Sequence, residues 1–235
     1  MLNAIAIIPA RGGSKRIPRK NIKHFHGKPI IAYSIEAALG SQAFDEVMVS
    51  TDDTEIAEVA KKYGASVPFL RSATTSTDMA MTVPVLLEVL DEYTRQGQNY
   101  DFGCCLYPCA PFITPNRLRD CMKLFLDSGA DSALPVARFS YPPQRCLVVR
   151  GGKAAMLHPE NYNVRSQDLE PLYHDAGQFY CFRTASLRRE RKLYCANTVP
   201  IVLLDTEVQD IDTEDDWLVA EVKYRILKET GLGSV

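Results

Sequence analysis

The chain is organised around residues 4–21, which read AIAIIPARGGSKRIPRKN. The segment Leu2–Ile8 overlaps the start of this stretch. It is almost entirely apolar, is rich in Ile and stops at Pro9, so it predicts a buried strand. The loop after it holds two glycines and five cations, and no acidic residue appears before Glu36. A buried strand that ends in a small-residue, cationic loop presents backbone N–H groups and positive charge to phosphates. We therefore expect a phosphate-binding site directly after the first strand.

Apolar runs of strand length alternate with helical patterns over the first 136 residues. The predicted strands are Leu2–Ile8, Val47–Ser50, Ala65–Leu70, Phe102–Tyr107 and Asp131–Val136. The predicted helices begin at Lys28-Pro29, at Asp52–Glu55, near Val83 and at Asn116. This alternation predicts a mainly parallel sheet with helices on its faces.

The alternation stops after residue 136. Residues 141–173 contain Pro and Gly pairs and read as an inserted arm, with a hairpin turn at Gly151-Gly152. Two further strands, Gln178–Phe182 and Val199–Leu204, and a final helix from Trp217 to Leu227 complete the pattern.

Composition narrows the class of protein. At 235 residues the chain is one large domain or a domain with a sub-domain. Its 27 basic and 29 acidic residues give no overall field for nucleic acid or anionic membranes, so neither partner is expected. Seven cysteines without a Cys-x-x-Cys pair favour free thiols. With no signal peptide visible and no apolar run near the roughly 20 residues that span a bilayer, a cytoplasmic protein is expected.

The cationic loop matches neither the Walker pattern nor Gly-x-Gly-x-x-Gly, which argues against a P-loop ATPase and a dinucleotide dehydrogenase. As a phosphate site, Gly12, Gly13 and Ser14 would offer backbone and hydroxyl donors, while Arg11 and Lys20 would hold a polyphosphate. The alternative is a solvated turn whose cations only keep it soluble.

A second charged segment lies near the C-terminal end. If it is extended, Asp210 and Asp212 share one face and Ile211 turns inward. Two carboxylates on one face suit Mg²⁺, which completes its shell with water and substrate phosphate. The alternative is capping of the final helix by Asp212 or Thr213. Together with the cationic loop, the pair describes a metal-dependent nucleotidyltransferase.

These segments also carry a family resemblance that runs over about residues 4–228. The matching motifs are Ile8–Lys15 with Lys20-Asn21, Val49–Asp53, the Arg71 loop, Arg165–Leu169 and Asp210–Thr213. In this order they resemble the CMP–sialic acid synthetases, the cytidylyltransferases of nine-carbon acidic sugars. The resemblance implies a Rossmann-like three-layer αβα nucleotidyltransferase fold over residues 1–235. It also implies an arm over 137–173 that serves dimerisation and sugar binding, and a homodimer.

The resemblance also implies site residues. Nucleotide-binding residues would be Ala10, Arg11, Gly12, Gly13, Ser14, Lys20, Asn21, Arg71, Thr77 and Asp78. Sugar-binding residues would be Tyr107, Arg165, Gln167, Tyr173, His174, Asp175 and Gln178. Arg11, Lys20, Asp210 and Asp212 would be catalytic, with Mg²⁺ on the two Asp residues. Asp52 and Asp53 are interpreted as a helix cap.

The implied reaction is attack by the anomeric hydroxyl of a 2-keto sugar acid on the α-phosphate of CTP. The sialic acid enzymes have Asn-Gly where this chain has Ala176-Gly177, and a Gln where it has Tyr107. The resemblance is stronger to the pseudaminic acid branch of the family, so pseudaminic acid is the expected acceptor. Alternatives are sialic, legionaminic or eight-carbon sugar acids, or a non-enzymatic nucleotide- or RNA-binding module.

Overall fold

The main sheet positions the site. The computed structural model describes residues 3–230, so Leu2 of the predicted first strand lies outside the described part. Within residues 3–230 this sheet has seven strands, in the order β11-β6-β10-β5-β1-β4 with β9 beside β6. The strands are β1 (Ala4–Pro9), β4 (Glu46–Ser50), β5 (Phe102–Leu106), β6 (Ser132–Arg138), β9 (Tyr173–Asp175), β10 (Phe179–Arg183) and β11 (Thr198–Leu203). Because β10 runs antiparallel to both β5 and β6, the strands β1, β4, β5, β6 and β11 share one direction. The predicted mainly parallel sheet is confirmed.

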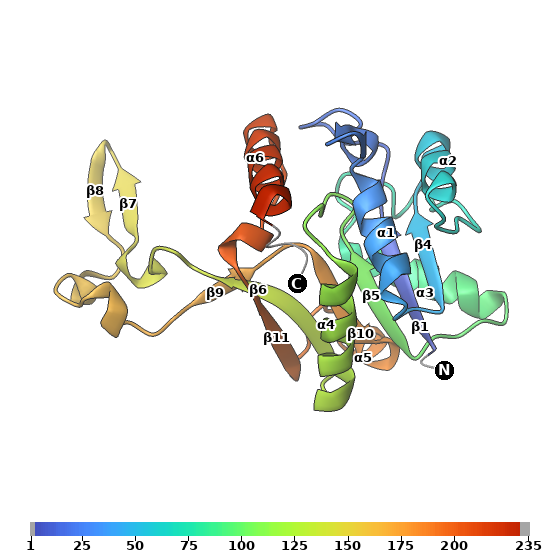
Figure 1. Ribbon diagram of the computed structural model, residues 1–235. Helices are drawn as coiled ribbons and strands as arrows, with labels where there is room; N and C mark the ends of the chain where they lie inside the picture. The colour runs from blue at the N-terminus through green and yellow to red at the C-terminus, as the bar shows by residue number, and fades with distance from the viewer. Residues whose placement is uncertain (1–2, 231–235) are drawn as a thin grey trace.

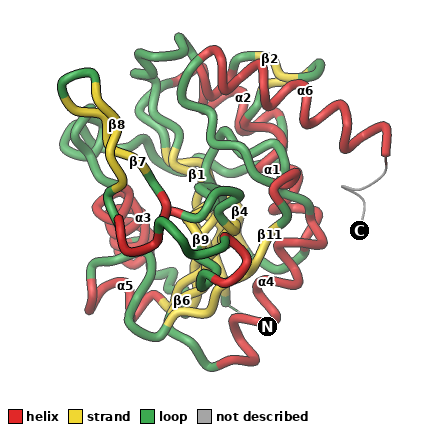
Figure 2. The backbone as a smooth tube through the Cα atoms, turned by 90° about the vertical axis from the view of Figure 1, so that its left-hand side faces the viewer, coloured by secondary structure: helices red, strands yellow, loops and turns green. Residues whose placement is uncertain are grey.

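Helices cover both faces of the sheet (Figures 1 and 2). They are α1 (Ile31–Ser41), α2 (Thr54–Lys62), α3 (Thr82–Arg95), α4 (Pro115–Ser128), α5 (Thr184–Glu190) and α6 (Glu214–Thr230). Short 3-10 helices lie at Lys20–Ile22, Pro143–Arg145, Pro159–Asn161, Ser166–Asp168 and Asp205–Glu207. The three-layer αβα architecture is confirmed. Among the described residues, no helix combines the length and apolar character needed to cross a membrane.

β1 lies inside the sheet and is buried on both faces. Ala4, Ala6 and Ile8 pack into the core layer of α1, α2 and α4, whereas Ile5 and Ile7 pack into the layer of α3 and α5. All five side chains are fully buried. This two-sided burial explains why the sequence shows a continuous apolar run instead of an alternating one.

The sheet changes winding direction beside β1. From β1 the chain moves to β4 on one side, and it later returns to β5 on the other side. In open α/β sheets, a crevice for ligands forms at such a switch point, outside the carboxyl ends of the strands. The loops that leave β1 and β5 therefore face one another across this crevice.

Two predicted elements are wrong. Ala65–Leu70 is not a strand: only an isolated bridge joins Ser66 to Met48, because Pro68 has no N–H to continue a ladder. Lys28-Pro29 does not open a helix, since it forms β3 (Lys28–Pro29) and pairs with β2 (His24–Phe25). Helix α1 begins only at Ile31.

The arm predicted from the break in alternation extends away from the sheet (Figure 1). Its tip is a hairpin of β7 (Leu147–Arg150) and β8 (Lys153–Met156). Gly151 and Gly152 form the turn with φ of 56° and 74°, a region that glycine enters at little cost. The predicted hairpin is confirmed. The division of the chain into one domain with a dimerisation insertion at 137–173 stays a prediction.

Candidate active site

The cationic loop is fixed against the start of α2. The N–H of Gly12 donates to Asp52 Oδ1 at 2.9 Å, and Arg19 donates to both carboxylate oxygens of Asp53. Asp53 also caps α2 by accepting from the N–H of Ile56 at 3.0 Å. The prediction that Asp53 caps this helix is therefore confirmed. Its second task, anchoring the loop, was not predicted.

Gly12 is required where the loop meets this anchor. A Cβ at Gly12 would lie 2.6 Å from Asp53 Oδ2, whereas a Cβ at Gly13 would meet nothing closer than Arg11 Nη1 at 3.8 Å. Arg19 adopts a left-handed φ of 55°, which is uncommon outside glycine. In that conformation its side chain forms ion pairs with Asp53 and Glu55.

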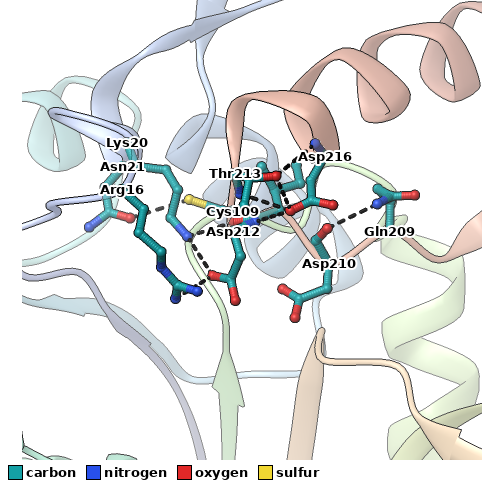
Figure 3. A network of polar contacts seen from close by, with 10 residues as sticks. Arg16, Lys20, Asn21, Cys109, Gln209, Asp210, Asp212, Thr213 and Asp216 are labelled. Atoms are coloured by element: carbon teal, nitrogen blue, oxygen red, sulfur yellow. Dashed lines mark hydrogen bonds and ion pairs between the residues drawn. The ribbon is translucent and has the colours of Figure 1, made fainter. Parts of the chain in front are cut away.

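Two carboxylates from distant segments balance the cations of the loop. Asp78 forms ion pairs with Arg11 and Lys15. Asp212 accepts from Arg16 at 2.8 Å and lies 3.5 Å from the Lys20 ammonium (Figure 3). The loop is thus no solvated turn of unpaired cations. It is one wall of a charged site.

The acidic segment brings both predicted carboxylates to one pocket. Ile211 is buried, and Asp210 and Asp212 reach into the pocket from either side of it. Thr213 accepts from the N–H of Asp216 and so caps α6, which frees Asp212 from capping. Lys20 donates to the Ile211 carbonyl at 2.7 Å, which joins this segment to the cationic loop.

The Asp210–Asp212 pair suits a divalent cation. Burial, together with the charge of Asp212, raises the pKa of Asp210. A cation bound to the two carboxylates would relieve the repulsion between them. Across residues 3–230, no group of three or more His, Cys, Asp and Glu side chains forms a complete protein cage. Two protein carboxylates are nevertheless a usual number of protein ligands for Mg²⁺, because water molecules and substrate phosphate oxygens complete its coordination shell.

A pocket of about 380 Å³ lies at the switch point between these walls. It is lined by Pro9, Arg11, Ser14, Lys15, Arg16, Ile17, Lys20, Asn21, Arg71, Ala80, Thr82, Val85, Tyr107, Pro108, Cys109, Gly177, Asp210, Ile211 and Asp212. The loops after β1 and β5 thus form opposite sides, as the winding of the sheet requires. Lys15, Arg16 and Cys109 were absent from the expected site, although the first two stand in the cation run that indicated it.

Asn21, one of the predicted residues, connects the two sides. Its Nδ2 donates to the Arg11 carbonyl at 2.9 Å, and its Oδ1 accepts from the Cys109 thiol at 3.3 Å. Burial raises the pKa of Cys109 to about 12, so the thiol keeps the proton that it donates. Ala10 is buried beneath the loop, and its N–H donates to the Ser50 carbonyl at 2.9 Å.

Arg71 and the segment after it form the third wall. The Arg71 guanidinium is buried and donates to the carbonyl and hydroxyl of Ser50. Asp78 faces the cationic loop, whereas Thr77 accepts from the N–H of Ala80 through its backbone carbonyl and is not among the residues that line the described pocket.

The expected sugar residues fall into two groups. Tyr107 lines the pocket, and Gln178 is buried near it, donating to the Glu207 carbonyl at 2.5 Å. Asp175 accepts from the Tyr180 hydroxyl at 2.8 Å, and Tyr180 packs against Tyr107. This group is held together at the ends of β5 and β10.

The second group lies on or near the arm. Arg165 is paired with Asp168 at 2.7 Å, and Gln167 lies in the same turn. His174 packs against Phe139, next to Tyr173 on β9. None of these four predicted sugar residues is among the residues that line the described pocket of their own chain.

Fold and pocket together define a nucleotidyltransferase. A sequence model described as "Cytidylyltransferase" matches residues 5–206, and the chain belongs to that family. A pseudaminic acid cytidylyltransferase of Campylobacter jejuni is 41% identical over 227 residues, which cover 96% of this chain and 98% of the relative. A CMP-N,N'-diacetyllegionaminic acid synthase of Legionella pneumophila is 34% identical over 235 residues, covering 97% and 99%.

Solved structures agree on the fold. A CMP:2-keto-3-deoxy-manno-octonic acid synthetase, solved in complex with CTP, superposes with a TM-score of 0.70 at 21% identity. The match covers 96% of this chain and 99% of that chain. It supports the Rossmann-like nucleotidyltransferase architecture.

Proposed function

We propose that this chain transfers CMP from CTP to the anomeric hydroxyl of pseudaminic acid and releases pyrophosphate. The observation that carries the proposal is the 41% identity to a pseudaminic acid cytidylyltransferase over nearly the whole of both chains. The pocket supports it, because it combines phosphate-binding cations with two carboxylates beside a second, partly aromatic wall. A cytoplasmic location, expected from the sequence, fits a reaction that consumes CTP.

Charge neutralisation is the main task of the site, because a triphosphate and a sugar carboxylate must meet there. Arg11 and Lys20 would hold the phosphates and stabilise the charge that grows on the departing pyrophosphate. The N–H groups and hydroxyl of Gly12, Gly13 and Ser14 would complete this cradle. Asn21 and Arg71 would contact the nucleoside, with Thr77 and Asp78 on the facing loop.

Asp210 and Asp212 would hold Mg²⁺. When bound there, the cation neutralises phosphate charge and lowers the pKa of a coordinated hydroxyl. Asp212 would orient the attacking hydroxyl, and either its carboxylate or a water would accept the proton. Lys20, which contacts both Ile211 and Asp212, would keep this carboxylate next to the phosphates.

On the sugar side, Tyr107, Asp175 and Gln178 would line the acceptor pocket together with Tyr173 and His174. Arg165 and Gln167 would contribute from the arm, with the Arg165 guanidinium meeting the sugar carboxylate bidentately. In the structure the Arg165 guanidinium donates to the carboxylate of Asp168. This carboxylate is exposed, so a ligand carboxylate can replace it.

We further propose that the arm builds a homodimer and completes the pocket of the partner subunit. The support is that Arg165 lies on the arm and does not line the pocket of its own chain. The hairpin tip also exposes apolar side chains, with Leu147 61% and Val149 74% accessible. Such side chains are typical of a surface that another chain covers.

Analytical ultracentrifugation tests the dimer. The variant Leu147→Asp/Val149→Asp should sediment as a monomer and lose sugar-dependent turnover while it still binds CTP. Leu70→Asp is the matched control, since Leu70 is 51% exposed and belongs to the segment whose Ser66 bridges to β4, the strand at the opposite edge of the sheet from β11. A double variant that stays dimeric and active would contradict this role of the arm.

The reaction is tested by incubating the protein with CTP, Mg²⁺ and, separately, pseudaminic, legionaminic, sialic and eight-carbon sugar acids. Pyrophosphate release should be fastest with pseudaminic acid and should require CTP among the four nucleoside triphosphates. If pyrophosphate is released only with one of the other sugar acids, that acid is the acceptor in place of pseudaminic acid. Salt-sensitive RNA binding without any pyrophosphate release would favour the binding module.

A further inference from the structure

The first part of the loop between Arg71 and α3 is anchored to α3. Glu88 on α3 accepts from the N–H of Ser72 at 2.7 Å and from its hydroxyl at 2.9 Å, and it also accepts from Thr75. The tip of this loop, residues 77–81, exposes Met79 and Met81 to solvent.

One side chain joins the tip to the cationic loop. Among the described residues, the recorded polar contacts of the tip outside its own loop and α3 are those of Asp78. Its two carboxylate oxygens are divided between Arg11 and Lys15. Both partners belong to the cationic loop, and both line the pocket.

These ion pairs are exposed to water. The side chains of Asp78 and Lys15 are 45% and 78% accessible, so the pairs are screened and readily exchanged for another anion. Hydrogen bonds from Lys15 and Arg11, together with their charges, lower the pKa of Asp78, which keeps its carboxylate ionised at neutral pH. Asp212 differs, because its segment is also bound to the cationic loop through the Ile211 carbonyl, which accepts from Lys20 at 2.7 Å.

We propose that Asp78 competes with polyphosphates for Arg11 and Lys15, and thereby weakens their binding so that pyrophosphate is released readily. A ligand that takes these cations must replace the carboxylate. A triphosphate does so because it brings several negative charges, whereas a monophosphate product leaves the Asp78 pairs in place. Once pyrophosphate forms, the same carboxylate competes with it and favours its departure.

The proposal rests on the proposed function for the identity of the triphosphate, CTP. It also has a structural consequence, because Ala80 lines the pocket two residues from Asp78. Replacement of Asp78 by phosphate therefore releases a segment of the pocket wall.

The test is isothermal titration of wild type and Asp78→Asn with CTP, CMP and inorganic tripolyphosphate. Loss of two exposed ion pairs should tighten CTP and tripolyphosphate binding by about three- to tenfold and leave CMP within about twofold. Inhibition by pyrophosphate should strengthen by the same factor as CTP binding. Asp91→Asn, which removes a comparably exposed pair with Arg188, is the control and should change none of these affinities.

Weaker CTP binding by Asp78→Asn would overturn the proposal, since Asp78 would then assist the nucleotide. Unchanged affinities, or an equal gain for CMP, would overturn it too. The tripolyphosphate titration separates this result from the proposed function. If wild type neither binds CTP nor makes a CMP-sugar, the proposed function fails, while a tighter tripolyphosphate complex in Asp78→Asn still supports competition by Asp78.

Discussion

Replacing Gly12 by Ala tests how the cationic loop is built. The new methyl group would lie 2.6 Å from Asp53 Oδ2 and 2.9 Å from its Cβ, too close for any side chain to remain in place. Asp53 cannot turn away freely, because it caps α2 through the Ile56 N–H and binds Arg19. The loop must therefore shift, or the helix must lose its cap.

The size of the effect follows from those contacts. Loss of an N-cap costs about 1 kcal/mol, and forced overpacking costs about 1 to 3 kcal/mol. A net loss of about 2 kcal/mol lowers the melting temperature of a chain of this size by about 4 to 8 °C. Since Arg11 precedes Gly12 directly, CTP binding should weaken as well.

Gly13→Ala is the matched control, because its methyl group would meet nothing closer than 3.8 Å. Differential scanning calorimetry gives the stability of both variants, and titration calorimetry gives their affinity for CTP. The Gly13 variant should remain near wild type in both measurements. Equal behaviour of the two variants would refute the role assigned to the Asp53 anchor.

Three further substitutions test other parts of the account. Asp212→Ala should abolish pyrophosphate release while CTP binding stays measurable by titration; wild-type turnover would disprove the metal assignment. Arg11→Ala should weaken CTP binding and slow turnover in steady-state assays, and an unchanged KM and kcat would exclude it from the phosphate site. Gly103→Ala should lower the unfolding free energy in urea by about 1 to 3 kcal/mol, because its Cβ would clash with the buried Phe182 ring. A stability equal to wild type would show that β5 and β10 can separate there.

The sequence was most informative where local chemistry and position coincide. From Ala4 to Pro9 every residue is apolar because β1 is buried on both faces, so pattern alone identified this strand. The two-residue spacing of Asp210 and Asp212 likewise predicted that both carboxylates reach one site, and both line the pocket on either side of the buried Ile211.

Contacts between distant segments could not be predicted. Asp78 meets Arg11 across 67 residues, and Arg16 meets Asp212 across 196, because the sheet order brings their loops together. No local pattern contains that order. The same limit applies to Asp53, whose capping position was readable but whose pairing with Arg19 depends on the parallel packing of β1 against β4.

Local patterns also gave a wrong secondary structure where a single residue prevents the element that the composition predicts. Ala65–Leu70 has the apolar content of a strand, but Pro68 prevents a continuous ladder beside β4. The arm was recognised by its break in alternation. Its direction, and hence the separation of Arg165 from the pocket of its own chain, follows only from the three-dimensional structure.

The most direct test of the central claim is a competition in a single reaction. Pseudaminic, legionaminic and sialic acids at equal concentration are incubated with limiting CTP, Mg²⁺ and the protein, and the CMP-sugars are separated by liquid chromatography and identified by mass spectrometry. The account predicts that CMP-pseudaminic acid is the dominant product, with one pyrophosphate formed for each CMP-sugar. Predominance of CMP-legionaminic or CMP-sialic acid, or CTP consumption without any CMP-sugar, would contradict it.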